Sequence, residues 1–361
     1  MKKVLFILHL PPPVHGSAVV GKFIKDSELI NSSFNTSYIN LGTSKTIEEI
    51  GKSPHKKVLI YLKIILQVIC QLLFNRPQIA YLAITAKGVG FYKDFVIVLL
   101  IKILGVKLVI HHHNKGVKKR QNKFVDNILY KITYWNTKVI LISKYLYNDV
   151  SKYVKKEDIS YCANGVPEFA SIPKATKNNT VQLLFLSNLI ESKGVYILLK
   201  ALRILKERNA NFFCTFIGRE GDISAEDFNQ KALELTIENF VTYKGKRYGK
   251  EKEAAFATSD IFVFPTCNDV FGLVNLEAMQ YSLPVVSTAE GGIPDIVEDG
   301  ETGFLVIPKD VEGLADKIEI LINNDAMRLK MGANGRKRYE EKFTLKKFEK
   351  KFQSILKEVT S

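Results

Sequence analysis

Residues 265–302 read PTCNDVFGLVNLEAMQYSLPVVSTAEGGIPDIVEDGET. An apolar run ends at the start of this stretch, a loop with Asp269 follows, and Gly272 opens a helical pattern that contains Glu277. Pro284 ends the helical pattern and introduces a second apolar run. A strand, a loop, a helix and another strand in this order are typical of a parallel sheet, in which ligands bind beyond the carboxyl ends of the strands.

The same alternation of strand-like and helical runs extends along the whole chain. Strands are predicted over Val4–Leu10, Ile79–Ile84, Lys107–His111, Val139–Ser143, Val181–Ser187, Phe212–Ile217, Ile261–Pro265 and Val285–Ser287. Helices are predicted between them, for example over Val195–Arg208, Ala225–Glu238 and Val311–Ile322. Continuous apolar strands that alternate with helices favour parallel sheets that are covered on both faces.

The length of 361 residues is enough for two domains. Residues 171–180 are polar, interrupt the alternation and are interpreted as a linker between two α/β domains of similar size. We therefore predict an N-terminal domain over residues 1–170, a C-terminal domain over residues 171–342 and a Lys-rich C-terminal helix within residues 343–361.

Positive charge is concentrated in the first predicted domain. The chain has 52 Lys and Arg against 37 Asp and Glu, a formal net charge of +15. Residues 1–170 hold 25 basic and 10 acidic residues, whereas residues 171–361 hold 27 of each. This asymmetry indicates an anionic partner for the first domain, either lipid headgroups, a phosphorylated substrate or nucleic acid. Solubility alone is the alternative interpretation.

The remaining composition excludes several classes of protein. Hydrophobic residues at 46% and charged residues at 25% are ordinary for a globular chain, which excludes disordered, collagen-like and disulfide-scaffold proteins. The four cysteines are far apart and form no C-x-x-C, so a reduced, cytoplasmic protein is predicted.

Three apolar stretches could be mistaken for membrane or signal segments. Residues 1–10 precede three prolines and no small-residue cleavage site, so a buried first strand is predicted. Residues 58–74 are interrupted by Lys63, Gln67 and Gln71, and residues 95–104 are short, so both are predicted to be helices that face the core. Partial insertion of the first helix into a bilayer surface is the alternative.

The strand-to-helix corner within residues 265–302 is the strongest candidate binding site. The backbone N–H groups of Phe271, Gly272 and Leu273 are predicted to face a ligand unpaired, and the helix dipole would favour a phosphate there. Asp269 on the loop and Glu277 inside the helix can reach one cleft. Because carboxylates accept paired hydrogen bonds from vicinal hydroxyls, a sugar and a ribose are predicted ligands.

These residues resemble the signature of the family 4 retaining glycosyltransferases. That family has two acidic residues with seven others between them, Phe-Gly among the seven, and then Pro-Val-Val and Gly-Gly. The matching residues here are Asp269, Phe271, Gly272, Glu277, Pro284, Val285, Val286, Gly291 and Gly292. The first acid is usually Glu, and Asp269 is one methylene shorter. The resemblance implies the GT-B fold, in which two Rossmann-like doubly wound domains face each other across a cleft and the C-terminal helix packs back on the first domain.

A second stretch, residues 185–195, fits the same family, which has Gly-Arg and then Lys-Gly here. Lys193 and Gly194 match, whereas Ser187 and Asn188 stand in place of Gly-Arg. The resemblance implies that Lys193 binds the donor diphosphate, and that another cation, Arg219 or one from the first domain, replaces the missing Arg. The donor-binding residues implied in this way are Gly16, Asn188, Lys193, Gly218, Arg219, Asp269, Phe271, Gly272, Leu273 and Glu277.

In the first half, Gly16 stands in the loop after the first strand, where the family has a Gly-rich loop. Residues 111–113 are three consecutive histidines at a strand end. Neighbouring strand positions point to opposite faces, which disfavours one metal ion shared by all three. The family has a strand-end His close to the donor sugar, and the register favours His113, with His111 second. The implied catalytic residues are therefore His113, Lys193 and Asp269.

The predicted reaction is transfer of a hexose from a nucleotide diphosphate sugar to a hydroxyl with retention of configuration. The resemblance implies this co-substrate and no cofactor, and the absence of D-x-D, G-x-G-x-x-G and Walker A motifs disfavours metal-dependent transferases, dehydrogenases and P-loop enzymes. The acceptor is predicted to be a polyprenyl-diphosphate-linked sugar or growing surface polysaccharide, with the enzyme peripheral on the inner membrane face. A nucleotide-sugar 2-epimerase and a basic nucleic-acid-binding protein are the alternatives.

Overall fold

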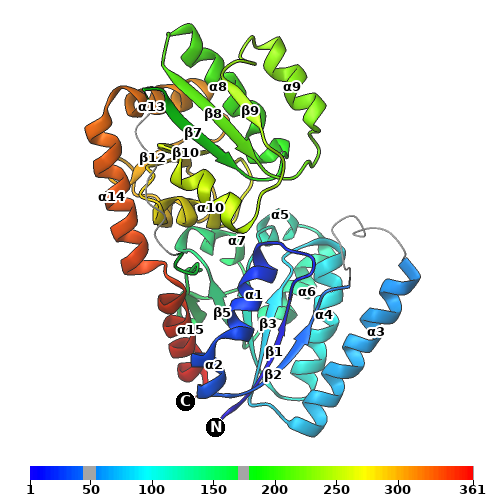
Figure 1. Ribbon diagram of the computed structural model, residues 1–361. Helices are drawn as coiled ribbons and strands as arrows, with labels where there is room; N and C mark the ends of the chain where they lie inside the picture. Colours follow the sequence, from blue (N-terminus) through cyan, green and yellow to red (C-terminus); the bar gives the residue numbers. More distant parts are fainter. Residues whose placement is uncertain (44–53, 170–178, 361) are drawn as a thin grey trace. The chain divides into compact units, whose positions relative to one another are not determined.

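The computed structural model of the chain describes residues 1–43, 54–169 and 179–360. The chain forms two compact units (Figure 1): unit 1 consists of residues 1–164 and the C-terminal segment from Leu345, and unit 2 runs from Gly165 to Thr344. The boundary predicted at residue 170 lies a few residues after the observed one. Residues 171–178 of the predicted linker lie outside the described residues.

Unit 1 is built on a six-stranded parallel sheet with strand order β2-β1-β3-β4-β5-β6. The strands are β1 (Lys3–Leu8), β2 (Asn35–Asn40), β3 (Ile79–Ile84), β4 (Lys107–His112), β5 (Lys138–Leu141) and β6 (Ile159–Tyr161). The main helices are α1 (Gly16–Asp26), α2 (Glu28–Ser33), α3 (Pro54–Cys70), α4 (Gly88–Ile103), α6 (Phe124–Tyr134) and α15 (Leu345–Thr360), and a π-helical turn η1 (Gln71–Asn75) extends α3.

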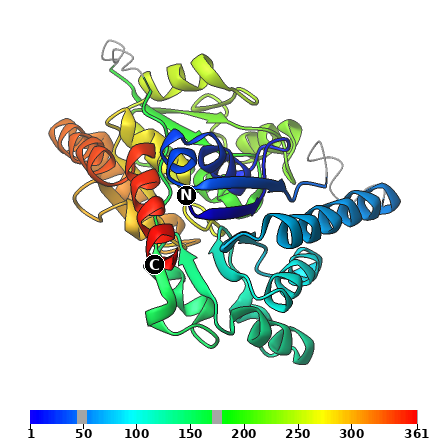
Figure 2. The ribbon, with the colours of Figure 1, turned by 90° about the horizontal axis from the view of Figure 1, so that it is seen from below.

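The two faces of this sheet are covered by different helices, as Figures 1 and 2 show. Leu5 and Ile7 of β1 point to the face covered by α3, α4 and α6, where they join one apolar cluster. Phe6, between them, points to the other face and packs against Phe352 of α15, which also meets Tyr81 with ring centroids 5.4 Å apart. The strand alternation therefore incorporates the C-terminal helix into the core of unit 1.

Unit 2 has a second six-stranded parallel sheet, with order β12-β11-β10-β7-β8-β9. Its strands are β7 (Val181–Leu186), β8 (Phe212–Ile217), β9 (Val241–Tyr243), β10 (Ile261–Phe264), β11 (Val285–Thr288) and β12 (Gly303–Val306). Its helices include α8 (Val195–Glu207), α9 (Ala225–Glu234), α10 (Gly249–Ala257), α11 (Leu273–Gln280), α13 (Val311–Asn323) and α14 (Asp325–Lys342). The chain order reverses between β7 and β10, which makes their carboxyl ends the topological switch point of this sheet.

The prediction of two doubly wound α/β domains is confirmed, but the prediction that residues 58–74 face the core is wrong for most of α3. Ile64, Val68 and Leu72 form a buried row, whereas the side chains on the opposite side, such as Leu59 and Leu66, are exposed. Only one face of the helix packs on the sheet, and the opposite face is apolar as well. Residues 95–104 are divided in the same way, because α4 buries one side and exposes the other.

Candidate functional site

Lys193 and Asp269 meet at the switch point of unit 2. Lys193 lies on the loop after β7 and Asp269 on the loop after β10. The Lys193 Nζ donates to Asp269 Oδ2 at 2.7 Å and to the backbone carbonyl of Asn268 at 3.0 Å. Both side chains are mostly buried, with 24% and 19% exposed, so the pair is shielded from bulk water. The structure thus brings together two of the predicted catalytic residues.

Asp269 also holds its own loop. Its Oδ1 accepts the N–H groups of Val270, Phe271 and Gly272 at 2.7, 3.1 and 2.9 Å. The prediction that the N–H groups of Phe271 and Gly272 are unpaired is therefore wrong. An Asp side chain is short enough to reach the backbone two and three residues ahead, which fixes the turn before α11. The Phe271 ring is buried against Phe343, so its part in the site is to anchor the loop.

Unsatisfied polar groups remain at the start of α11. Leu273 is the first residue of the helix, and N–H groups of a first turn have no intrahelical acceptor. Asn275 is fully buried, and neither its Oδ1 nor its Nδ2 has a hydrogen-bond partner among the described residues. A buried amide without partners costs about 1–3 kcal/mol. Phosphate oxygens would accept from Asn275 Nδ2 and from the N–H groups at the helix N-terminus, whereas Asn275 Oδ1 needs a donor such as a hydroxyl group.

Two glycine positions allow the loops around this corner to approach closely. Gly272 has φ +76°, and a Cβ there would lie 2.7 Å from Asn275 Nδ2. Gly291, after β11, has φ +55°, and a Cβ there would overlap the backbone oxygen of Asp269. The next residue, Gly292, donates its N–H to the carbonyl of Val270 at 2.8 Å. Gly291 and Gly292, at the end of the neighbouring strand β11, thus pack against the Asp269 loop and hydrogen-bond to it.

Replacement of Gly194 by Ala is expected to lower the free energy of unfolding by more than about 3 kcal/mol. Gly194 has φ +89°, and an added Cβ would overlap the carbonyl oxygen of Pro265, where the loop of Lys193 meets the end of β10. Gly245→Ala is the matched control, because Gly245 has φ +67° but open space around it, so only about 1–2 kcal/mol of backbone strain is expected. Urea unfolding measures both, and equal losses would contradict the packing argument.

Glu277 lies in the second turn of α11 and is paired with a residue that the sequence analysis missed. Its Oε1 accepts from Lys252 Nζ of α10 at 2.7 Å, and the two side chains are 17% and 24% exposed. No hydrogen bond from another described residue reaches Oε2. The ammonium therefore fixes the carboxylate and leaves one oxygen available to accept from hydroxyl groups. No spacing rule relates Lys252 to Glu277, which are distant in the chain.

Asn188, Gly218 and Arg219 meet where β7 and β8 end. The backbone of Gly218 passes against Ser187, and a Cβ at Gly218 would overlap the Ser187 carbonyl oxygen. Asn188 Oδ1 accepts the N–H of Arg219 at 3.4 Å, and Leu189 N–H donates to the Arg219 carbonyl at 2.8 Å. The predicted residues of unit 2 thus lie on the loops after β7, β8 and β10 and on the first two turns of α11.

Gly16 and His113, the remaining predicted residues, belong to unit 1 and lie at the carboxyl edge of its sheet. His113 follows β4, and its buried Nδ1 has no hydrogen-bond partner among the described residues. Burial, and to a smaller extent the nearby His112, His9 and His15, lower the pKa of His113 to about 3. His113 is therefore a neutral imidazole at neutral pH. His15 caps α1 next to Gly16, and it is near enough to His113 to lower the pKa of that residue.

The other two histidines of the run have tyrosine partners instead. His111 Nδ1 lies 2.8 Å from the Tyr81 hydroxyl, and His112 Nε2 lies 2.9 Å from the Tyr134 hydroxyl, on opposite faces of β4. Within residues 1–43, 54–169 and 179–360, no group of three His, Cys, Asp or Glu side chains is placed to hold a metal ion. His9 and His15, which the sequence analysis did not select, could have been noticed as two histidines in the loop after the first strand.

One family model and several known proteins match parts or all of the chain. Residues 168–338 match the family model described as glycosyl transferases group 1. Over 189 residues the chain is 32% identical to the capsular polysaccharide biosynthesis glycosyltransferase CapM of Staphylococcus aureus. The matched segment covers 50% of this chain and 48% of that protein. The chain spans less than half the length of the first curated relatives it matches.

Two solved structures are similar over 99% of this chain at 18% sequence identity. One is the Anabaena protein HepE in complex with UDP and glucose, covered over 100% of its chain with a TM-score of 0.73. The other is a glycosyltransferase from Rickettsia africae, covered over 98% of its chain with a TM-score of 0.74. At this identity the likeness shows the fold, which is shared along the whole chain.

Proposed function

Because residues 168–338 belong to the glycosyl transferases group 1 family and the whole chain has the GT-B fold, we propose that the protein is a retaining glycosyltransferase. It moves a hexose from a nucleotide diphosphate sugar to a hydroxyl acceptor. The single observation that carries the proposal is the corner between β10 and α11, where Lys193 and the unpartnered Asn275 lie at the start of the helix and Glu277 lies in its second turn.

Each part of the donor has a partner of suitable chemistry in unit 2. The diphosphate binds at the start of α11, where the N–H of Leu273, the Asn275 amide and the Lys193 ammonium supply donors and positive charge. The ribose hydroxyls donate to Glu277 Oε2, while Lys252 holds Oε1. The helix N-terminus thus selects the phosphates, and the carboxylate behind it selects the vicinal diol.

Transfer is driven by fixed charge. As the bond between the anomeric carbon and the phosphate oxygen breaks, negative charge grows on the diphosphate and positive charge on the sugar ring. Lys193 and the N–H groups of α11 stabilise the diphosphate without a metal ion, since they are already oriented. The acceptor oxygen attacks on the face that the diphosphate leaves, and the leaving phosphate oxygen takes the hydroxyl proton. Asp269 orients the donor sugar.

The acceptor is a polyprenyl-diphosphate-linked sugar or a growing surface polysaccharide. This part of the proposal is supported by the basic excess of residues 1–170 and by the name of the relative CapM, a capsular polysaccharide biosynthesis glycosyltransferase. An anionic lipid carrier supplies both the charge and the membrane surface that a basic domain would attract. The enzyme then works as a peripheral protein on the cytoplasmic face of the membrane.

Titration with a panel of nucleotide diphosphate sugars tests the proposal. The parent is expected to bind at least one of them, and Glu277→Ala to bind it about 10–100-fold more weakly, since hydrogen bonds to charged groups contribute about 1.5–3 kcal/mol. Glu207→Ala is the matched control, because Glu207 is an exposed carboxylate at the end of α8. If the parent binds no nucleotide sugar, or both variants bind alike, the site assignment fails.

A further inference from the structure

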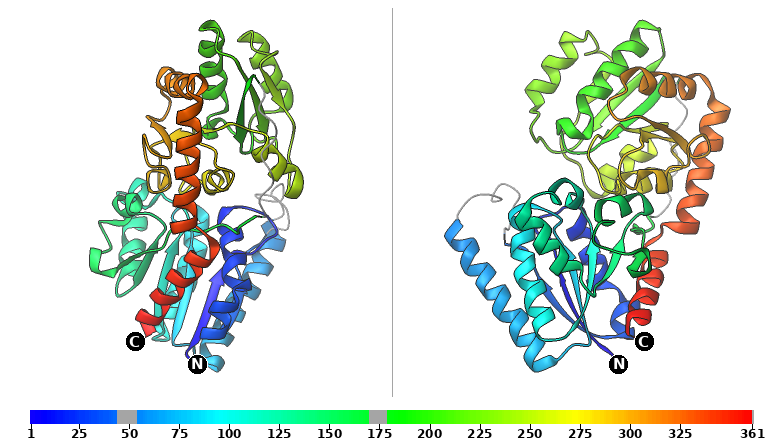
Figure 3. Two further views of the ribbon diagram at one scale, coloured as in Figure 1. Left: turned by 60° about the vertical axis from the view of Figure 1, so that its left-hand side comes forward. Right: turned by 180° about the vertical axis from the view of Figure 1, so that it is seen from behind.

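Helices α3, α4 and α6 form one layer on the sheet of unit 1, and the outer surface of this layer is apolar. The helices pack side by side with α4 in the middle (Figure 3). Large exposed apolar side chains lie on these helices, on η1 and directly after α6, and include Leu59, Leu66, Leu73, Ile103, Ile128 and Trp135. Leu66 is 62% exposed, Ile103 70% and Trp135 73%. We call this surface the outer apolar face.

The exposure of the outer apolar face extends along a whole helix and is not confined to one residue. Residues 57–75 form a helix long and apolar enough to cross a membrane, and only 17% of it is buried. Its inner row, Ile64, Val68 and Leu72, is packed into the core cluster of unit 1, so the helix is part of the folded sheet layer. A surface helix normally carries polar residues on the side opposite its buried row. Here both sides are apolar, which indicates a second apolar environment.

The charge of the layer complements an anionic surface. Only two acidic residues lie on the three helices, Asp94 and Asp126, and both are buried. Asp126 is also paired with Arg120 at 2.6 Å. The exposed charged residues of these helices, such as Lys63 and Lys131, are therefore all basic. A second copy of this chain placed on the same face would bring like charges together, which disfavours a symmetric dimer through it.

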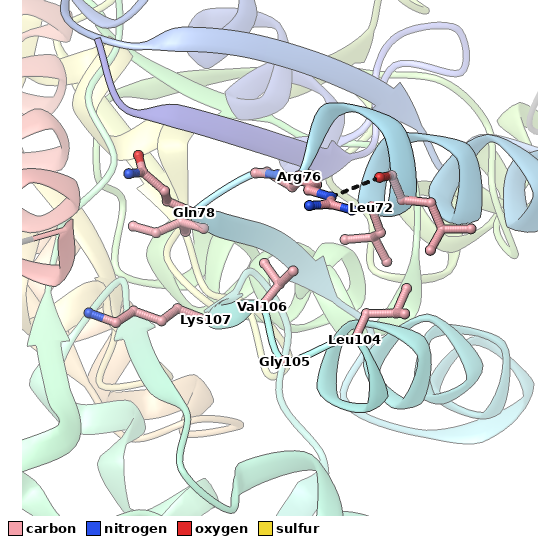
Figure 4. Close-up of a pocket in the computed structure, with 10 residues that line it drawn as sticks. Leu72, Arg76, Gln78, Leu104, Gly105, Val106 and Lys107 are labelled. Carbon is pink, nitrogen blue, oxygen red and sulfur yellow. Dashed lines mark hydrogen bonds between the residues drawn. The ribbon is translucent and has the colours of Figure 1, made fainter.

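A pocket of about 620 Å³ opens at one end of the layer (Figure 4). Leu72 and Leu73 of η1 and Leu104 and Val106 after α4 form its apolar wall, and the cations Arg76 and Lys107 line the same pocket. In the described part of the chain, the side chains of Arg76 and Lys107 donate to backbone carbonyls, of Leu73 and Val359, and to no carboxylate. A phosphate-bearing headgroup with the start of its acyl chains matches this combination.

We propose that the outer apolar face is a docking surface for a bilayer containing anionic phospholipids. The three helices lie along the interface, their apolar side chains enter the boundary between headgroups and acyl chains, and the surrounding lysines contact the headgroups. This inference rests on the proposed function, since a lipid-linked acceptor is the reason for the enzyme to bind a membrane. It names the surface that would bring the enzyme to that acceptor.

Vesicle flotation with a matched pair of variants tests the surface. Leu66→Glu places a charge on the outer apolar face, and Leu233→Glu places one on α9 of unit 2, where Leu233 is 60% exposed. Vesicles of phosphatidylcholine alone and vesicles containing phosphatidylglycerol are compared at about 0.05 M and about 0.5 M salt. The parent and Leu233→Glu are expected to float with the anionic vesicles at low salt, and Leu66→Glu to bind them at least about tenfold more weakly.

The outcomes separate the surface from the catalytic proposal. Circular dichroism checks that Leu66→Glu is folded. Nucleotide-sugar titration is repeated on it, and unchanged affinity is expected because Leu66 is an exposed side chain of α3 and is not one of the candidate donor-binding residues. Absence of parent binding to any vesicle, or equal binding by the two variants, overturns the docking surface. So does a parent dimer that Leu66→Glu dissociates in sedimentation velocity. Vesicle binding without nucleotide binding would instead reject the glycosyltransferase proposal and leave the surface standing.

Discussion

Replacement of Lys193 by Ala is expected to reduce the transfer rate by a factor of about 100 to 1,000. Lys193 is the cation at the switch point, it is mostly shielded from water, and its ammonium lies 2.7 Å from Asp269 Oδ2 and beside the start of α11. Charge that develops on a leaving diphosphate would be stabilised there more than the charge of the bound donor. The loss should therefore affect kcat more than KM.

The structure supplies controls for this experiment. The loop of Asp269 should remain folded in Lys193→Ala, since Asp269 Oδ1 still accepts three backbone N–H groups. Lys200→Ala removes an exposed lysine from α8 of the same unit and should leave the rate unchanged. Steady-state kinetics with the donor found by titration measures all three proteins. A Lys193→Ala rate within tenfold of the parent would contradict the assigned role.

Acidification from pH 7 to pH 5 is expected to destabilise unit 1 and to leave unit 2 nearly unaffected. All six histidines lie in unit 1. Burial lowers the pKa of His9 and of His112 to about 4 and of His113 to about 3, and it lowers the pKa of His111 as well. The unfolded chain then binds more protons than the folded one below pH 6.5, so stability falls as the pH drops from 6.5 towards the folded values.

For the fully buried His112, the free energy of unfolding falls by about 2 kcal/mol at pH 5. His9 and His113 are partly exposed, so each lowers the free energy of unfolding by less than its pKa shift alone would suggest. Asp94 acts in the opposite direction. Burial raises its pKa to about 6, so acidification returns about 1 kcal/mol. The net loss is still large beside a typical domain stability of about 5–15 kcal/mol.

Hydrogen exchange at pH 7 and pH 5, corrected for the intrinsic rate, should show β1 and β4 losing protection and β7 and β10 keeping it. Equal changes in both units would contradict this account.

The strands that the sequence predicts and those that it misses differ in their position in the sheets. The eight predicted strands are the inner four of each sheet, which are continuous apolar runs because both faces are covered. The missed ones, β2, β6, β9 and β12, are the four edge strands. They are short or partly polar, as in the NTSYIN of β2, because an edge strand is half-exposed. Local periodicity therefore identifies the centre of each sheet and not its margins.

The candidate site shows the same division between local and distant information. Asp269, Glu277 and the glycines around them lie in one stretch whose spacing is readable, and the strand-to-helix corner is at the predicted place. The hydrogen-bond partners of these residues cannot be predicted from the local sequence. Lys252 comes from another helix, and the capture of the Phe271 and Gly272 N–H groups by Asp269 depends on a carboxylate one methylene shorter than the usual Glu.

The return of α15 to unit 1 makes unit 2 an insertion between two segments of the other unit. Unit 2 is one continuous segment, so all of its strands are available for pairing before α15 has been synthesised. At that moment all the strands of unit 1 have been synthesised, but Phe352 has not. The side chains that pack on Phe352 are therefore still uncovered, namely those of Phe6, Tyr81 and His111. On the ribosome the later-translated unit can therefore complete its core first, and the earlier one has to wait for the last helix.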